Sequence, residues 1–375
     1  MLRLQFMISL NMVNRGTKFT GVCIAIYLIY ALFVFVILPM LMPNPVAMSR
    51  SMLAQQTRHL GDLSKYSLET GGKPVRSMLV SFRGSGALKL LDYLTRQPGN
   101  YHHFSPLIAY RNRITQKSRI ERALNELVSL YNCDYNNSLP MLRWMKTPSF
   151  KNFYGMQWKT CVAYTSEVCW NPEIMANICR IFPFINMSVY NLGLKYLSVL
   201  LRRKDLNLRI LLLIRDPRGT MASRSNRAWC SGKPECSQPN DLCASMVDDY
   251  SIAEQLLHDY PDRFSIIRYE ELAMDPSSGL KKIFDFYGLP MKTTEDKFKL
   301  KLSSVGLEKT NSLLFERPME WMDTLLPQDV EKIENVCEEA MNLWGYNPIA
   351  QIANSSSGTF VALKTMPIFL KPNLK

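Results

Sequence analysis

Metal-binding patterns are missing from this 375-residue sequence, which contains only four histidines. No CxxC pair occurs, and no histidine lies between Cys161 and Cys243, so the cysteine spacings match no zinc site. Internal repeats and low-complexity blocks are also absent, which excludes a repeat architecture. No metal site is therefore expected.

Acidic residues are few, with 32 Asp and Glu against 45 Lys and Arg, giving a net charge of +13. Nucleic acid is the usual partner of so basic a chain. The sequence has no basic run interleaved with aromatic residues, however, so it does not predict a nucleic-acid groove. Anionic ligands of another kind match the charge better.

Charged side chains are also missing from residues 21–42, which are rich in Ile, Leu, Val, Phe and Tyr and numerous enough to span a bilayer. The residues before them carry three basic side chains and no acid, which places them in the cytosol by the positive-inside rule. A cleaved signal peptide is the alternative, but the apolar core is long and no small-x-small site follows it. We predict a cytosolic tail at 1–18 and a single-pass type II anchor at 19–43.

The rest of the chain would then lie in the lumen of the secretory pathway. We expect a polar stem at 44–73, a folded domain at 74–350 and a tail at 351–375. At 47% hydrophobic residues, the chain can bury one large α/β core or two modest domains.

Cysteines and glycosylation sequons agree with a lumenal location. Eight of the nine cysteines follow the anchor, and an even set suits disulfides in an oxidising compartment. These cysteines occupy positions 133, 161, 169, 179, 230, 236, 243 and 337. Sequons begin at Asn136, Asn186 and Asn354.

Strand and helix patterns alternate along the domain. Strands are expected at 76–82, 210–214 and 264–268, and helices at 87–94, 118–130, 241–260, 277–287 and 327–343. Residues 133–179 are expected to be irregular. This alternation predicts a parallel sheet covered by helices on both faces.

The stretch 208–224, LRILLLIRDPRGTMASR, carries the strongest chemical signal. A buried strand ends at Arg215, and a helix-permissive segment places the hydroxyl of Ser223 nearby. A cation and a hydroxyl at the carboxyl end of a strand suit an anionic ligand, because open α/β sheets bind ligands there. The alternative is a surface Arg-Asp pair that caps a core strand.

A second signal is the glycine-containing loop 81–87, SFRGSGA. A strand that leads through such a loop into a helix presents backbone N–H groups suited to phosphate. An ordinary tight turn is the alternative. A nucleotide-kinase loop is disfavoured because no Gly-Lys-Ser/Thr follows the strand.

The segment RDPRGTMASR resembles the 3′-phosphate-binding motif of sulfotransferases that use 3′-phosphoadenosine 5′-phosphosulfate (PAPS). It is most similar to the Golgi carbohydrate 6-O-sulfotransferases, and further likenesses in order run from about residue 75 to 347. Among these are RYEEL at 268–272, Trp321, Cys337 and Gly345-Tyr346. The resemblance implies the P-loop-like parallel sheet of that fold.

The resemblance also implies roles for particular residues. Arg215 and Ser223 would bind the 3′-phosphate of PAPS, and the loop would bind its 5′-phosphosulfate. Arg83 would stabilise the departing phosphate. The implied loop contacts are Arg83, Gly84, Ser85, Gly86 and Ala87.

Two departures from the family pattern affect this chemistry. The hydroxyl residues of the family loop map to Gly84, Gly86 and Ala87, so side-chain donors are lost. The usual glutamate base maps to Ser105, and we hypothesise that His103 or His102 replaces it. The alternative is that both histidines are loop residues without a chemical role.

Smaller differences lie elsewhere in the motif set. Met322 stands where the family often has arginine after its tryptophan, and the usual Lys-x-x-Arg is missing at 187–191. From the resemblance we expect a Cys230–Cys243 disulfide, with the state of Cys236 left open.

The resemblance implies a Golgi membrane enzyme that transfers sulfate from PAPS to a glycan, at the 6-hydroxyl of GlcNAc, Gal or GalNAc. Residues 133–179 would supply acceptor-binding surface, and a homodimer is one expected assembly. The donor is a cosubstrate, and neither a metal nor nucleic acid is implied. The alternative is a lumenal protein with lost chemistry that binds nucleotide or glycan without transfer.

Overall fold

A computed structural model describes residues 22–38, 74–95, 99–110, 113–147, 170–225, 227–230, 232–289 and 318–350. Its centre is a five-stranded sheet in the order β2-β3-β1-β4-β5, in which every neighbouring pair is parallel. The strands are β1 (Val75–Ser81), β2 (Asn100–Phe104), β3 (Phe184–Val189), β4 (Arg209–Ile214) and β5 (Phe264–Arg268). The predicted parallel sheet is thus confirmed.

Alternating side chains of the strands supply two separate cores. Leu79, Leu211 and Leu213 point into one core, whereas Met78 and Leu212 point into the other. Because side chains alternate along a strand, a continuous apolar run such as that of β4 is buried on both faces. The sheet is therefore covered on both sides, as the alternation of elements predicts.

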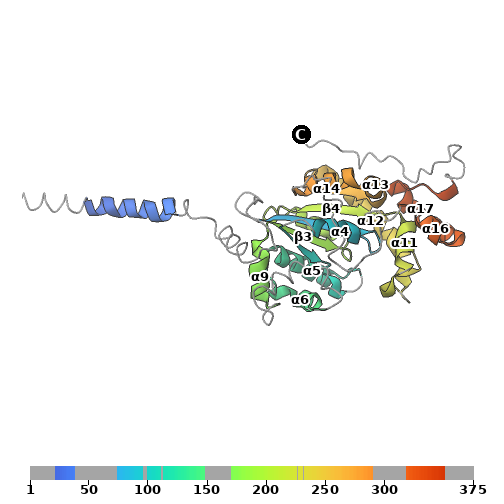
Figure 1. Ribbon diagram of the computed structural model, residues 1–375, viewed down its shortest axis with the longest axis horizontal. Helices are drawn as coiled ribbons and strands as arrows, with labels where there is room; N and C mark the ends of the chain where they lie inside the picture. Colours follow the sequence, from blue (N-terminus) through green and yellow to red (C-terminus); the bar gives the residue numbers. More distant parts are fainter. Residues whose placement is uncertain are drawn as a thin grey trace, which may run out of the picture.

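Helices form the outer layers. Figure 1 shows α13 and α14 on one side of the sheet and α5 and α6 on the other. The longer helices are α4 (Ala87–Thr95), α5 (Lys117–Tyr131), α9 (Pro172–Ile181), α10 (Leu194–Leu201), α11 (Pro217–Ser225), α12 (Asn240–Asp259), α14 (Pro276–Tyr287) and α17 (Pro327–Trp344). The short ones are α6 (Leu139–Met145), α13 (Tyr269–Met274) and α16 (Trp321–Thr324).

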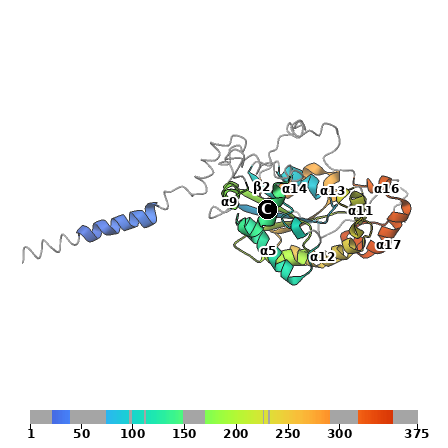
Figure 2. The same ribbon diagram turned by 90° about the horizontal axis from the view of Figure 1, so that it is seen from below.

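Local sequence explains where the last long helices begin and end. Asp275 caps α14 by accepting a hydrogen bond from the N–H of Ser278, and Gly288 ends that helix in the left-handed conformation. Pro327 begins α17, and Gly345 ends it at φ 75°. Helices α11, α16 and α17 lie together at one end of the domain (Figure 2).

Several elements escaped sequence reasoning. Strands β2 and β3 were not predicted, and 133–179 is not wholly irregular because α6 and most of α9 lie in it. Residues 148–169 of that segment lie outside the described residues.

The described N-terminal residues 22–38 are helical, with a π-helical stretch at Phe33–Ile37. Over the part of the chain that the structure describes, no helix combines the length and apolarity needed to cross a membrane. The ends of the predicted anchor, 19–21 and 39–43, lie outside the described residues, as do the predicted tail 1–18, stem 44–73 and C-terminal tail 351–375. The anchor stays a prediction.

Three disulfides join six of the described cysteines, and Cys23 is free and exposed. They are Cys133–Cys179, Cys230–Cys236 and Cys243–Cys337. The expected Cys230–Cys243 pairing is therefore wrong. Cys230 closes a short loop with a cysteine six residues away, whereas Cys243 joins α12 to α17 across 94 positions of sequence. Cys161 and Cys169 lie outside the described residues.

The first two sequons differ sharply in accessibility. Asn136 is exposed in a short 3₁₀ turn. Asn186 is buried in β3, where its amide contacts Ser77 and His102, so the folded domain leaves no room for a glycan there. Asn354 lies outside the described residues.

Candidate functional site

The glycine turn lies between the carboxyl end of β1 and the start of α4. Gly84 and Gly86 have φ angles of 90° and 83°, which residues other than glycine rarely adopt. A Cβ on Gly84 would also come within 2.9 Å of the Thr220 carbonyl oxygen, and one on Gly86 within 2.4 Å of the Tyr269 ring. Both glycines are thus required by conformation and by close approach of neighbouring elements.

Ser85 lies between these two glycines with its side chain inside the protein. Its backbone N–H closes the turn on the Phe82 carbonyl at 3.0 Å. Its hydroxyl is buried and has no hydrogen-bond partner among the residues that the structure describes. A buried hydroxyl without a partner is costly, so this atom is suited to a ligand. Ala87, the first residue of α4, is half-buried beside it.

Arg215 meets this turn from the end of β4. The Nη1 atom of Arg215 donates to the Gly84 carbonyl oxygen at 3.1 Å, and its guanidinium lies 4.4 Å from the centre of the Tyr269 ring. A Cβ on Gly219 would come within 3.0 Å of the Arg215 Nε atom, so a glycine makes room for this side chain. The carboxyl ends of adjacent strands therefore bring together two motifs that lie 131 positions apart.

Arg224 makes a matching contact that the sequence analysis missed. Its Nε atom donates to the carbonyl oxygen of Arg83 at 2.8 Å, and its side chain is buried. Two guanidinium groups thus bind consecutive carbonyls of the turn. The sequence signal was the arginine that ends the motif RDPRGTMASR, next to Ser223. Ser223 itself is half-buried on α11.

Arg83 extends from the turn between two aromatic rings. Its guanidinium carbon lies 4.2 Å from the centre of the Trp229 ring and 4.9 Å from that of Tyr190. Its Nη2 atom also donates to the Tyr190 hydroxyl at 3.3 Å. Trp229 immediately precedes Cys230 of the Cys230–Cys236 disulfide, so this ring lies directly beside a covalently closed loop. Cation–π contacts of this kind fix a guanidinium in position.

The two histidines proposed as bases lie inside β2 and not in a loop, and the alternative that they have no chemical role stays a prediction. His103 is 0% exposed, and its Nε2 atom lies 2.8 Å from the Tyr135 hydroxyl. His102 pairs through Nδ1 with the Asn186 side-chain oxygen at 2.7 Å. Burial lowers the pKa of His103 to about 3 and that of His102 to about 4.

Ser105 follows β2 in a left-handed conformation at φ 46°, which is uncommon for a residue with a side chain. It is buried, and its N–H donates to the Ser188 hydroxyl at 3.1 Å. The structure thus brings Arg83, Gly84 and Arg215 together. His103 instead contacts Tyr135, and Ser105 contacts Ser188.

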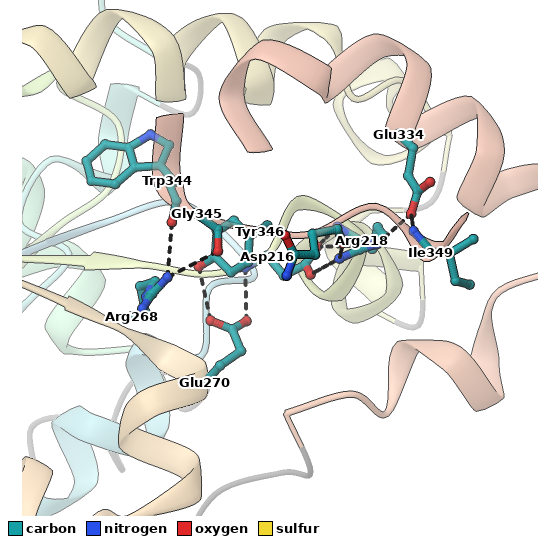
Figure 3. Close-up of polar contacts among 10 residues, drawn as sticks. Asp216, Arg218, Arg268, Glu270, Glu334, Trp344, Gly345, Tyr346 and Ile349 are labelled. Carbon is teal, nitrogen blue, oxygen red and sulfur yellow. Dashed lines mark hydrogen bonds and ion pairs between the residues drawn. The ribbon is translucent and has the colours of Figure 1, made fainter. Parts of the chain in front are cut away.

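Buried charges link the Arg215 segment to the C-terminal part of the domain (Figure 3). The Asp216 carboxylate accepts hydrogen bonds from the N–H and Nε of Arg218 at 2.8 and 3.0 Å. Arg218 also pairs with Glu334 of α17 and stacks 4.2 Å from the centre of the Trp321 ring. The base of α11 is therefore fixed to α16 and α17.

Glu270 completes this cluster from the start of α13. Its carboxylate accepts a hydrogen bond from the Asp216 N–H at 2.9 Å and another from the Tyr346 hydroxyl at 3.0 Å. Burial, together with the nearby Asp216 carboxylate, raises the pKa of Glu270 to about 7.

This arrangement is suited to a phosphorylated ligand. Peptide N–H groups and guanidinium groups gather at the carboxyl ends of β1 and β4, where parallel sheets bind anions. A guanidinium carries five N–H donors, so a bond to one carbonyl is compatible with binding a phosphate.

Comparisons with known proteins give the chain a family. A model of the sulfotransferase domain matches residues 75–345, which is more than half of the chain. Mouse carbohydrate sulfotransferase 5 is 24% identical over 331 residues, covering 74% of this chain and 82% of that protein. Carbohydrate sulfotransferase 3 of Tetronarce californica is 28% identical over 186 residues, covering 44% of this chain and 42% of that protein. The crystal structure of mouse sulfotransferase SULT7A1 complexed with PAP has 14% identity and a TM-score of 0.36, covering 78% of this chain and 91% of that one.

Proposed function

The chain belongs to the sulfotransferase domain family, and we propose from this premise that it transfers sulfate from PAPS to a hydroxyl group of a glycan. The names of its relatives, carbohydrate sulfotransferases 5 and 3, support a sugar acceptor. The proposed acceptor position is the 6-hydroxyl of GlcNAc, Gal or GalNAc, as the motif likeness implies.

One contact carries the proposal, the hydrogen bond from Arg215 to the Gly84 carbonyl. It supports the idea that the motif for the 3′-phosphate and the loop for the 5′-phosphosulfate serve one nucleotide. Arg215 and Ser223 would hold the 3′-phosphate, and residues 83–87 would hold the phosphosulfate. The buried Ser85 hydroxyl fits a group that approaches the backbone closely.

The proposed reaction is an in-line displacement at sulfur. The acceptor oxygen forms a bond to sulfur while the bond between sulfur and the bridging phosphate oxygen breaks, and that oxygen keeps the electron pair. Arg83 would stabilise the negative charge that develops there, which is the largest single contribution in many enzymes of this kind. Its position between Trp229 and Tyr190 supports this role because a fixed cation does not need to reorganise during the reaction.

The acceptor proton requires a base, for which the sequence proposes the segment 102–105. The pKa of His103, lowered to about 3, makes it a weak base, and its contact with Tyr135 favours a structural role. Replacing both histidines by asparagine separates these ideas. Loss of turnover with unchanged PAP affinity supports a histidine base, whereas unchanged turnover refutes the idea that a histidine replaces the glutamate.

Binding without transfer is the second candidate function. The absence of hydroxyls at Gly84, Gly86 and Ala87 and the burial of His103 favour it. Titration calorimetry with PAP and radiolabelled sulfate transfer to a panel of glycans distinguish the two functions. PAP binding without transfer to any acceptor refutes the enzymatic proposal.

The same calorimetry tests the nucleotide site by comparing variants of two arginines, Arg209 at the start of β4 and Arg215 directly after its end. Both Arg215 and Arg209 donate a hydrogen bond to a carbonyl, but they lie at opposite ends of the strand. R215A should weaken PAP binding by about tenfold to a hundredfold, the value of one charge-assisted contact or more. R209A should leave PAP affinity unchanged. Equal affinities of the two variants would refute the assignment of the site.

We also propose that the domain lies in the Golgi lumen on a type II anchor and forms a homodimer. The even cysteine set and the described disulfides support an oxidising compartment. Protease protection of the domain in intact Golgi vesicles tests its orientation. Sedimentation equilibrium of the purified protein tests the dimer.

A further inference from the structure

The first two residues of α13, directly after β5, contact the two residues that directly follow β4. Tyr269 lies beneath the Arg215 guanidinium at 4.4 Å, and Glu270 accepts the hydrogen bond of the Asp216 peptide N–H at 2.9 Å. Tyr269 therefore supports the side chain of Arg215, and Glu270 fixes the backbone next to Arg215.

The C-terminal segment holds Glu270 in turn. The hydroxyl of Tyr346 donates to the second carboxylate oxygen of Glu270 at 3.0 Å. Arg268 donates through Nη1 to the carbonyl oxygens of Trp344 and Gly345 at 3.4 and 3.2 Å, which fixes the residues just before Tyr346. Figure 3 shows these contacts as a continuous path from the end of α17 to Asp216.

The Glu270 carboxylate is 1% exposed, so water does not replace a lost partner there. The Asp216 carboxylate is already engaged with Arg218 and supplies no substitute acceptor for its own backbone N–H. Removing the Glu270 carboxyl would therefore leave a buried peptide N–H without a partner directly beside Arg215.

We propose that Glu270, held by Tyr346, is a positioning residue for the nucleotide site. It fixes the turn at Asp216 and thereby keeps the Arg215 guanidinium against the glycine turn. This inference rests on the proposed function, because it requires Arg215 to bind the nucleotide. It extends that function to the C-terminal segment, whose integrity PAP binding then requires.

The test uses PAP calorimetry and donor kinetics on the full chain with E270A and E270Q. E270A should raise the Kd for PAP and the KM for PAPS by about tenfold, with kcat at saturating donor unchanged within about threefold. E270Q should restore both values to within about threefold, because its amide oxygen can accept from Asp216 and its NH2 group can donate to Tyr346. A purely structural role would lower stability without raising the Kd for PAP in the folded protein.

Glu126 offers a matched control. It too is a buried carboxyl whose pKa is raised to about 7, and its partner is Tyr110 rather than Asp216. E126A should lower stability as E270A does but leave PAP affinity unchanged in the folded protein. Equal weakening by E126A and E270A, or full affinity in E270A, would overturn the proposal.

Two further variants keep the outcomes separate. If E270A does not fold, Y346F removes one hydrogen bond and should weaken PAP binding by about threefold to tenfold. Wild-type affinity in Y346F would then overturn the proposal. Failure of R215A to affect PAP binding would instead refute the proposed function, whatever the result at Glu270.

Discussion

Substitution of Gly86 by alanine tests the packing of the glycine turn against the Tyr269 ring. The added methyl group would meet two penalties, a backbone at φ 83° and a Tyr269 ring carbon at 2.4 Å. Gly232 provides the matched control, because its φ is 72° and a Cβ there would meet nothing within 4 Å. The two variants therefore share the conformational penalty and differ in the steric one.

The expected magnitudes follow from these two penalties. A left-handed alanine costs about 1–2 kcal/mol, so G232A should lower the free energy of unfolding by about that amount. Overpacking adds about 1–3 kcal/mol, so G86A should cost about 2–5 kcal/mol in total. Urea unfolding of the purified variants measures the difference.

Nucleotide binding should follow the same order. The Tyr269 ring supports the Arg215 guanidinium at 4.4 Å, so a ring displaced by the new methyl group moves the cation. G86A should therefore weaken PAP binding by about tenfold or more, while G232A leaves it unchanged. Calorimetry on the folded variants checks this result.

A double variant decides whether the ring is the cause. Removing the ring in Y269A makes room for the methyl group, so G86A and Y269A together should cost less than the sum of their separate losses, by about 1–3 kcal/mol. Additive losses, or equal unfolding free energies for G86A and G232A, would refute the steric argument.

Other regions of the structure give three further predictions. W229A should lower kcat for sulfate transfer by about tenfold and W229F by less, because a ring is needed to hold Arg83. Steady-state kinetics at saturating PAPS measure this, and a kcat of W229A equal to that of the wild type would contradict it. Burial lowers the pKa of His103 to about 3, whereas a histidine in the unfolded chain keeps its usual pKa of 6.5. The free energy of unfolding therefore falls as pH drops below 6.5, because the unfolded chain binds a proton that the folded protein does not. Acidification from pH 7 to pH 5 should destabilise the wild type by about 2 kcal/mol more than H103F, as urea unfolding would measure. N136Q should remove one glycan from the secreted domain and N186Q none, as gel mobility after glycosidase treatment would report.

The parts of the fold that could be predicted are those with a local cause. Strand β4 is visible as an apolar run because both of its faces are buried, and Arg215 follows directly from where that run ends. Helix α14 is marked at its ends by Asp275 and Gly288, whose capping roles depend only on neighbouring residues.

The parts that could not be predicted depend on distant partners. Strand β2 reads Asn-Tyr-His-His-Phe and has no apolar run, yet His102 and His103 are buried, with Asn186 pairing with one ring nitrogen of His102 and Tyr135 with one ring nitrogen of His103. The pairing of Cys243 with a cysteine 94 residues later likewise has no signal in local spacing. Arg224 was overlooked because its acceptor, the Arg83 carbonyl, lies 141 positions away.

The arginine contacts also bear on how the altered glycine turn would bind phosphate. Loss of hydroxyls at Gly84 and Gly86 removes neutral side-chain donors to phosphate, yet the carbonyls of Arg83 and Gly84, which would repel an anion, each receive a guanidinium. Hydrogen bonds in which one partner is charged are worth about 1.5–3 kcal/mol, and this holds for a hydroxyl that donates to phosphate as well as for a guanidinium. Under the proposed function, the attraction for phosphate would come from Arg215 at the end of β4 and Arg224 of α11 as well as from Arg83 of the turn itself. Affinity for the nucleotide would then depend on how firmly the segment with Arg215 is held, and Glu270, which accepts the hydrogen bond of the Asp216 N–H, would belong to the same functional unit.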